Sequence, residues 1–467
     1  MMSPTTVTPA DAFEDQPTIG LIGMGAMGEM YAKYLSQGGW KKINVCDLPS
    51  KYESLREKYA NTPGITVLQD GHAVARVSEF IMFSVEAEHI DKVVAQYGPS
   101  CKVGAIVAGQ TSVKAPEKDA FEKYLPLDTH IVSLHSLHGP TVSPVGQPLV
   151  IIKHRAPDWA VSLVENILKC FRSRFVYLTY EDHDLVTANV QAVTHAAFLT
   201  MGTAWAAMRD YPWQHGQYVG GIETVKVNIM HRIYANKWHV YAGLAILNPS
   251  AKVQIDQYAS SATELFKLML AGDEPGLRAR VFEARERVFG QAYKEGRVPI
   301  FLTEDVLDQF TIGGKPSKKA VANGDAANDT SAGNRNASPN SVGSNSHLSL
   351  LAMVDCWAKL GIHPFVHLDL AATPIFRMWI GVAEYLFRSE ARLDAAVRAA
   401  LYDTSHRSDD LEFVVGARGW SQCVSFGNFE LYRRRFAETA AFFEPQFDEA
   451  NTIGGAMIKA ISESSKS

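Results

Sequence analysis

Short apolar runs alternate with amphipathic segments over residues 18–179. Apolar runs of this length are typical of buried strands, and strands separated by helices predict a parallel sheet covered by helices. We expect strands at 20–23, 43–46, 80–85, 105–107, 130–134, 150–152 and 176–178. The pattern therefore predicts an N-terminal α/β domain with a doubly wound parallel sheet over residues 18–180.

Beyond residue 181 the pattern changes to long stretches in which Ala, Met, Leu and Trp recur at helical spacing. A period near 3.6 residues indicates amphipathic or buried helices. We expect helices at 185–208, 223–245, 254–270, 347–360, 374–388, 390–402, 409–417 and 429–443. Residues 181–467 are therefore predicted to form an all-helical C-terminal domain.

Two segments lack the apolar residues that a packed core requires. Residues 1–17 contain neither a basic nor an apolar stretch of the kind found in signal peptides. Residues 313–346 consist mostly of Gly, Ser, Asn and Ala. Such segments bury too little surface to offset their ordering entropy. We expect a disordered tail at 1–17 and a disordered insertion at 313–346.

Composition narrows the possible partners and compartments. The chain has 467 residues, enough for two to four domains, and a formal net charge of −5. That charge gives no electrostatic reason to expect nucleic acid or an anionic membrane as a partner. No apolar run approaches the length of about 18 residues that a membrane span needs. The five cysteines are scattered, so we expect no disulfide framework, no metal site and a cytoplasmic location.

A glycine-rich turn follows the first predicted strand. Residues 18–28 read TIGLIGMGAMG, in which Gly23, Gly25 and Gly28 form the pattern GxGxxG, and a helical pattern follows at once. In the Rossmann-type fold these glycines allow a tight turn, close approach of a pyrophosphate and close packing of the helix on the strand. Asp47 ends the second predicted strand, 19 residues after Gly28, where an acid binds the ribose. We assign the cofactor site to Gly23, Gly25, Met27, Gly28, Asp47, Ser84 and Val85.

Polar residues that directly follow predicted strands are the candidates for catalysis. Ligands of doubly wound sheets bind beyond the carboxyl ends of the strands. Glu86 follows one strand, the segment 109–114 (GQTSVK) follows the next, and His135 follows a third. A histidine in this position suits proton abstraction because its ordinary pKa is near neutrality. The alternative is that His135 only bonds backbone at the end of its strand.

The helical region offers three further candidates, each with a structural alternative. The acids in residues 181–184 (EDHD) fit the first turn of a helix, where they favour the helix dipole, so this pattern indicates mostly capping. His195 lies 12 residues after His183, near the same helix face. Arg232 lies in an apolar helix and must meet an anion, either a protein carboxylate or one on a substrate.

Several long stretches closely resemble the fungal, NADP-dependent prephenate dehydrogenase family of tyrosine biosynthesis. The likeness runs from about residue 18 to residue 458. It is most specific at 132–141 (VSLHSLHGPT), 146–153 (GQPLVIIK), 176–185 (VYLTYEDHDL), 187–203 (TANVQAVTHAAFLTMGT) and 232–252 (RIYANKWHVYAGLAILNPSAK).

This resemblance implies an oxidative decarboxylation, in which prephenate loses a hydride to the nicotinamide and carbon dioxide from its ring. The catalytic histidine of the family falls on His135, which would accept the proton of the C4 hydroxyl. Ser136 replaces the proline that follows this histidine in bacterial-type members. The serine of the Ser-Val-Lys motif falls on Ser112, which would hydrogen-bond the same hydroxyl. Arg232 would bind the ring carboxylate, and His195 would lie near the pyruvyl side chain.

The nature of the cofactor depends on the surroundings of Asp47. An acid at this position repels a 2′-phosphate and ordinarily indicates NAD. The resemblance implies NADP, and Ser50, Lys51 and Arg56 could counter the phosphate if Asp47 turns away. We therefore predict NADP, with NAD as the alternative. The resemblance also implies a homodimer formed through the helical domain, an active site in the cleft between the domains, and prephenate as the substrate, with arogenate as the alternative.

Two competing functions remain open. The segment GLIGMGAMG at 20–28 also resembles the β-hydroxyacid dehydrogenases, but no equivalent of their catalytic lysine motif is found in the helical region. A regulator that binds NADP without turnover is the second alternative. The presence of His135, Ser112 and Arg232 favours an enzyme.

Overall fold

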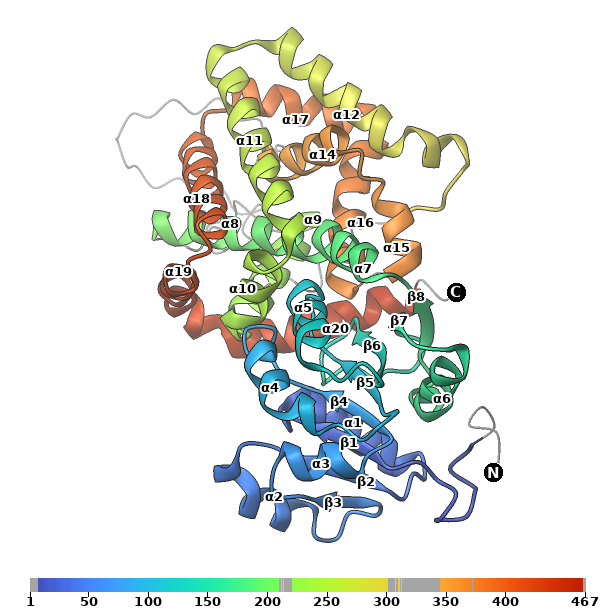
Figure 1. Ribbon diagram of the computed structural model, residues 1–467. Helices are drawn as coiled ribbons and strands as arrows, with labels where there is room; N and C mark the ends of the chain where they lie inside the picture. Colours follow the sequence, from blue (N-terminus) through green and yellow to red (C-terminus); the bar gives the residue numbers. More distant parts are fainter. Residues whose placement is uncertain are drawn as a thin grey trace. The chain divides into compact units, whose positions relative to one another are not determined.

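The computed structural model describes residues 7–209, 211, 213, 221–300, 307, 310, 312, 345–371 and 373–464. The chain divides into two compact units (Figure 1). The first contains residues 1–188, 242–251 and 369–373, and the second contains 189–241, 252–368 and 374–467. The first unit thus continues past the expected boundary at residue 180. Residues 1–6 of the expected tail and 313–344 of the expected insertion lie outside the described residues.

The first unit is built on one eight-stranded sheet with the order β3-β2-β1-β4-β5-β6-β7-β8. Its strands are β1 (Ile19–Ile22), β2 (Ile43–Cys46), β3 (Ile65–Val67), β4 (Phe80–Phe83), β5 (Ile106–Gly109), β6 (His130–Ser136), β7 (Pro148–Arg155) and β8 (Arg174–Tyr177). All neighbours are parallel except β6 and β7, which are antiparallel. The predicted α/β class is confirmed, and this one pair departs from the expected parallel arrangement. The connection 137–147 contains no crossover helix, which a parallel pair would need.

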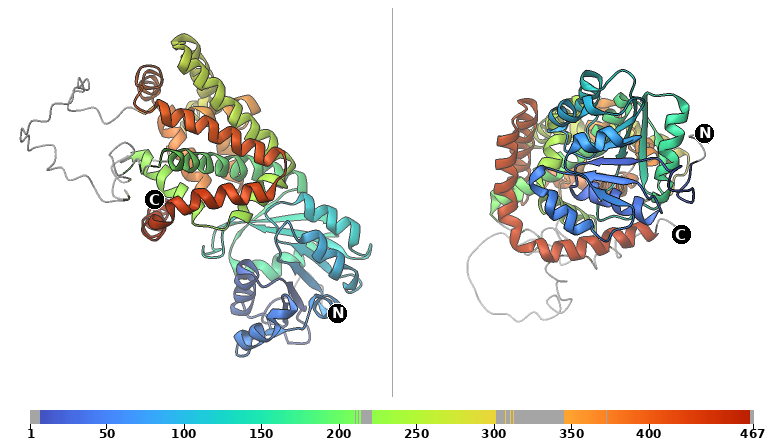
Figure 2. Two further views of the ribbon diagram at one scale, coloured as in Figure 1. Left: turned by 90° about the vertical axis from the view of Figure 1, so that its left-hand side faces the viewer. Right: turned by 60° about the horizontal axis from the view of Figure 1, so that its bottom comes forward.

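Helices cover both faces of this sheet (Figure 2). They are α1 (Ala26–Gln37), α2 (Tyr52–Tyr59), α3 (Gly71–Val77), α4 (Ile90–Tyr97), α5 (Ala115–Tyr124), α6 (Asp158–Leu168) and α7 (Tyr180–Thr187). Alternate residues of the central strands enter two separate cores: Phe80 and Met82 of β4 join one, and Ile81 and Phe83 join the other. Because both faces are buried, the central strands are apolar throughout, which is the pattern that made them recognisable.

Two strands differ from the sequence prediction. Strand β3 was missed because it has only three residues, half-buried or exposed, at the edge of the sheet. Strand β6 continues to Ser136, so His135 lies inside the strand rather than directly after it.

The second unit is helical, as predicted. Its helices include α8 (Val193–Met208), α9 (Gly221–Tyr234), α12 (Glu274–Lys294), α14 (Leu348–Leu360), α15 (Pro364–Ala371), α16 (Pro374–Arg388), α17 (Glu390–Tyr402), α18 (Arg407–Ser425), α19 (Phe429–Phe443) and α20 (Phe447–Ser464). Helices α10 (Trp238–Ile246) and α11 (Pro249–Ala271) each have residues in both units. The buried helix α8 packs beside α18 (Figure 2).

Helix boundaries also differ from those predicted. The predicted helix 185–208 is interrupted by one π-helical turn at Ala188–Ala192, and the predicted helix 223–245 is broken at 235–237 between α9 and α10. Helices α12, α15 and α20 were not predicted. Charged residues fill most of α12, and only a narrow stripe that includes Leu277, Val281 and Val288 is buried. A stripe so narrow gives a weak apolar period.

Residues 7–17 form hydrogen-bonded turns rather than a disordered tail. The buried Gln16 donates from Nε2 to the carbonyl oxygens of Pro9 at 2.9 Å and Asp11 at 3.1 Å. Its Oε1 accepts from the backbone N–H of Lys41 at 2.9 Å. This part of the prediction was wrong because one buried amide satisfies the backbone of a segment that has few apolar residues. Among the described helices, none is long and apolar enough to cross a membrane.

Candidate active site

The glycine-rich turn after β1 has the geometry of a dinucleotide-binding loop. Gly23 has a φ of +104°, and a Cβ there would lie 2.3 Å from the carbonyl oxygen of Ser84. A Cβ on Gly28 would lie 2.1 Å from the carbonyl oxygen of Gly23. A Cβ on Gly25 would meet nothing within 4 Å, and no side chain caps the first turn of α1. The turn therefore needs two glycines for its own packing and leaves the third beside open space, as a pyrophosphate requires.

Asp47 is bonded to this turn and to a lysine. One carboxylate oxygen, Oδ2, accepts from the backbone N–H of Met24 at 3.0 Å and lies 3.2 Å from Nζ of Lys51. The other accepts from the backbone N–H of Leu48 at 2.7 Å. The Asp47 side chain is 10% exposed. Its carboxylate thus holds the turn and has a cationic partner.

The cofactor candidates on β4 lie beside the same turn. Ser84 follows β4, and its hydroxyl donates to Oε1 of Gln110 at 2.8 Å. The side chain of Val85 would lie 3.1 Å from a Cβ on Gly23. The structure therefore brings Ser84 and Val85 together with the glycine turn, as expected.

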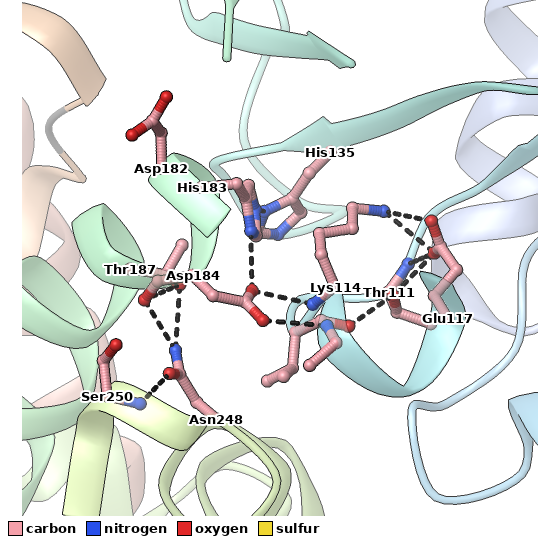
Figure 3. A network of polar contacts seen from close by, with 12 residues as sticks. Thr111, Lys114, Glu117, His135, Asp182, His183, Asp184, Thr187, Asn248 and Ser250 are labelled. Atoms are coloured by element: carbon pink, nitrogen blue, oxygen red, sulfur yellow. Dashed lines mark hydrogen bonds and ion pairs between the residues drawn. The ribbon is translucent and has the colours of Figure 1, made fainter. Parts of the chain in front are cut away.

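Three side chains lie in one hydrogen-bonded line that ends at His135 (Figure 3). Nδ1 of His135 lies 2.7 Å from Nε2 of His183, and Nδ1 of His183 lies 2.9 Å from Oδ1 of Asp184. His183 is completely buried, whereas His135 is 7% exposed. Its second ring nitrogen, Nε2, has no hydrogen-bond partner in the described part of the chain. That nitrogen is the reactive end of the line.

Asp184 also joins α7 to the beginning of α5. Its carboxylate accepts the backbone N–H groups of Lys114 at 2.7 Å and Ala115 at 2.8 Å, which belong to the first turn of α5. The side chain of Asn248 donates to the backbone carbonyl of Asp184 at 2.8 Å (Figure 3). A carboxylate at a helix N-terminus satisfies N–H groups that would otherwise lack partners.

A buried ion pair lies next to this line. The Lys114 and Glu117 side chains are both fully buried, and Nζ of Lys114 lies 2.9 Å from Oε2 of Glu117. The same Nζ donates to the carbonyl oxygens of Leu134 at 2.8 Å and Gly109 at 3.2 Å and to the hydroxyl of Ser133 at 3.0 Å. These contacts tie α5 to the ends of β5 and β6. They therefore fix the strand that carries His135.

Ser112 lies in the turn between β5 and α5, as predicted. On one side of it, the Thr111 hydroxyl bonds to the carbonyl of Val113 at 2.7 Å and to Glu117 at 2.6 Å. On the other side, Lys114 is held by Asp184. Ser112 is half-buried and has no hydrogen-bond partner in the described residues. Its turn is fixed while its hydroxyl stays available.

Burial keeps both histidines of the line neutral. Removal from water lowers the pKa of His135 and of His183 well below the ordinary value of 6.5, because burial disfavours the charged form. The positive charge of Lys114 lowers the pKa of both further. A neutral imidazole has one nitrogen that donates and one that accepts a hydrogen bond.

The two substrate-binding candidates of the second unit share a neighbour that the sequence analysis missed. The ring of His195 makes an edge contact with Tyr241 at a centroid distance of 4.8 Å. Burial raises the pKa of Tyr241 to about 12, and nearby Arg232 opposes this rise. Arg232 has no carboxylate partner within the described ranges. Nδ1 of His195 is buried without a hydrogen-bond partner, and burial lowers the pKa of this histidine to about 4. Among the described residues, nothing therefore supports the alternative of a structural ion pair at Arg232.

His183 and Asp184 were also missed, because the segment 181–184 was interpreted as helix capping. The cap of α7 is in fact Thr179, whose hydroxyl accepts the backbone N–H of Asp182 at 3.0 Å. His183 and Asp184 lie on the buried side of α7 together with Thr187. A polar stripe at helical spacing on a buried face was the signal that could have identified them.

Comparisons with known proteins agree over both units. Residues 18–130 match the NAD binding domain of 6-phosphogluconate dehydrogenase, and residues 192–463 match a 6-phosphogluconate dehydrogenase C-terminal domain. A probable prephenate dehydrogenase [NADP(+)] from Schizosaccharomyces pombe is 51% identical over 445 residues, which cover 95% of this chain and 97% of that protein. The prephenate dehydrogenase [NADP(+)] of Saccharomyces cerevisiae is 50% identical over 448 residues, which cover 95% and 93%. Among solved structures, prephenate dehydrogenase from Aquifex aeolicus aligns with a TM-score of 0.46 and 17% identity over 56% of this chain and 95% of that one.

Proposed function

The chain belongs to the family of fungal-type, NADP-dependent prephenate dehydrogenases, and on that basis we propose how its residues carry out the reaction. The activity is the oxidative decarboxylation of prephenate to 4-hydroxyphenylpyruvate in tyrosine biosynthesis. The observation that carries the assignment of roles is the orientation of His135. One ring nitrogen is bonded to His183, and the other is left for a substrate.

His135 is the general base. Its Nε2 accepts the proton of the C4 hydroxyl while the hydride leaves C4, and the ketone so formed drives loss of carbon dioxide from the ring. Bound NADP⁺ supplies the hydride acceptor. The imidazolium of His135 then returns the proton to the phenolate oxygen of the product. Atoms and charge balance, since prephenate and NADP⁺ give 4-hydroxyphenylpyruvate, carbon dioxide and NADPH without release of a further proton.

The remaining candidates bind the substrate. Ser112 donates from its hydroxyl to the C4 oxygen. Arg232 forms a bidentate pair with the ring carboxylate, for which a guanidinium has the matching planar geometry. His195, neutral because burial lowers its pKa to about 4, hydrogen-bonds the pyruvyl side chain. The absence of a carboxylate partner for Arg232 in the described residues supports this role.

The surroundings of Asp47 are compatible with NADP. The open space at Gly25 and the uncapped first turn of α1 would accept the pyrophosphate. Because its carboxylate bonds Met24 and pairs with Lys51, Asp47 presents less free negative charge to a 2′-phosphate than an unpaired acid would. We assign Lys51, whose side chain is 52% exposed, to that phosphate.

Assembly and location are further parts of the proposal. Helix α18 exposes Leu411 and Val415 on one face, and Phe426 at its end is 80% exposed. We propose that a second copy of the chain covers these side chains in a homodimer, which analytical ultracentrifugation of the wild type and of a Leu411→Glu/Val415→Glu variant would test. The five cysteines are all free, which favours the cytoplasm, and microscopy of a tagged chain would test this.

The test of the function is formation of reduced nicotinamide by purified protein with prephenate, with NADP and NAD supplied in parallel. Faster reduction of NADP is the expected result. A preference for NAD would contradict the assignment of Lys51, and reduction with arogenate but not prephenate would change the substrate. No reduction with either substrate would favour a nucleotide-binding regulator.

A further inference from the structure

We propose that His183 and Asp184 are positioning residues that hold His135 in the tautomer with an unprotonated Nε2. This inference rests on the proposed role of His135 as the general base. It adds two residues, which reach the substrate only through His135, and it assigns a function to the segment 181–184.

The direction of each hydrogen bond follows from Asp184. Its carboxylate accepts two backbone N–H groups, from Lys114 on Oδ1 and from Ala115 on Oδ2. Burial raises the pKa of Asp184, and these two donors oppose the rise. A carboxylate fixed as an acceptor requires that Nδ1 of His183, 2.9 Å away, donates its proton.

The second bond is then determined. Neutral His183 carries its single N–H on Nδ1, so its Nε2 accepts a hydrogen bond. The donor can only be Nδ1 of His135, at 2.7 Å. A neutral His135 that donates from Nδ1 has a bare Nε2, which is the form that a base needs. The opposite tautomer would place a proton on the reactive nitrogen.

The same line stabilises His135 after it has accepted the proton. The resulting imidazolium still donates through Nδ1 to His183, which is backed by the negative charge of Asp184. In the opposite direction, Lys114 and His138 lower the pKa of His135, and the negative charge of Glu181 raises that of Asp184. The anion therefore compensates for part of the cost of charging a buried histidine.

Asp184 could instead serve only as a cap for α5, so the test must separate the two roles. His183→Leu removes the line but leaves the bonds of Asp184 to Lys114 and Ala115 in place. Asp184→Asn puts an amide donor where only acceptors fit. Asp182→Asn is the matched control, because Asp182 is an acid of the same helical turn that bonds Thr179 and not the line (Figure 3).

The first readout is kinetic. We expect kcat to fall on the order of 10² or more in Asp184→Asn and His183→Leu, the direction known for triads in which the orienting acid is lost. In Asp184→Asn the acid limb of log kcat/KM against pH should also move to lower pH, because the protonated form of His135 loses a nearby anion. Asp182→Asn should match the wild type in both respects.

The second readout is spectroscopic and does not depend on activity. In ¹⁵N-histidine-labelled protein, assigned with His135→Asn, the nitrogen shifts should identify His135 as protonated at Nδ1 and bare at Nε2. In Asp184→Asn this preference should be lost. Protonation of the wild-type His135 at Nε2, or wild-type kinetics in both line variants, would overturn the proposal. If His135→Asn itself retained turnover, the general-base assignment would fail instead.

Discussion

The candidate residues of the two units differ in how their polar atoms are satisfied. Around His135 almost every polar atom is bonded to another part of the protein: Asp184 accepts from α5, and Lys114 donates to two strands and to Glu117. In the second unit, Arg232 and His195 have polar atoms without partners in the described residues. Buried polar groups normally have partners, so unsatisfied ones need a reason.

This difference separates preorganisation from recognition. A general base must have one tautomer and one orientation before the substrate arrives, and the protein supplies both through fixed hydrogen bonds. Groups that bind a substrate must keep their donors free, so they depend on the ligand for their partners. Mutations in the first region should therefore affect kcat or folding, and those in the second should affect KM.

The largest effect is expected for His135→Asn. Loss of a positioned general base should lower kcat by about 10² to 10⁴, while the affinity for NADP changes little because the glycine turn is intact. Turnover assays and fluorescence titration with NADPH would measure the two quantities. Turnover close to that of the wild type would contradict the role of His135.

Lys114→Met should break the first region through stability. It leaves the fully buried Glu117 without its cation, and such a loss costs about 3 to 5 kcal/mol. Denaturant titration would measure the free energy of unfolding. The double variant Lys114→Met/Glu117→Leu removes both charges and should recover part of this loss. A stability equal to that of the wild type in the single variant would exclude a structural role for the pair.

Arg232→Ala should change the second region only. Loss of a charged hydrogen-bond pair worth about 1.5 to 3 kcal/mol should raise the KM for prephenate by roughly 10 to 100-fold. Arg232→Lys keeps the charge but not the bidentate geometry, so it should give an intermediate KM. Steady-state kinetics would measure both. An unchanged KM in Arg232→Ala would mean that this arginine does not bind the substrate.

The pH profile should show which region limits the reaction in acid. Since burial lowers the pKa of His135, the base stays unprotonated below pH 6.5, and kcat/KM should hold there. It should then fall about tenfold per pH unit once the pH is below the pKa of His135. A limb that begins above pH 6.5 in stopped-flow assays would contradict the burial of His135.

The smallest effect is expected for Tyr31→Phe. The hydroxyl of Tyr31 on α1 bonds that of Ser136 on β6 at 2.7 Å, and both are buried. Its loss should cost about 0.5 to 1.5 kcal/mol of unfolding free energy, with kcat little changed. A large loss of kcat would indicate that this contact positions His135. Ser136→Ala provides the matched test from the other strand.

The sequence predicted what depends on local patterns. The glycine turn and the buried strands were predicted because turn chemistry and burial act over a few residues. The antiparallel direction of β7 was not predicted, since an apolar run carries no direction. His183 and Asp184 were missed because their partners, His135 and Lys114, lie 48 and 70 residues away along the chain. Contacts of that separation are properties of the fold.

The bonds of Asp47 limit how cofactor preference can be altered by protein engineering. In many dehydrogenases the acid after the second strand is the obvious position at which to exchange one nicotinamide nucleotide for the other. Here the same carboxylate holds the N–H of Met24 inside the glycine turn. Replacing Asp47 would therefore loosen the loop for both nucleotides at once. A redesign for NAD would have to retain Asp47 and remove positive charge from the helix that follows, beginning with Lys51.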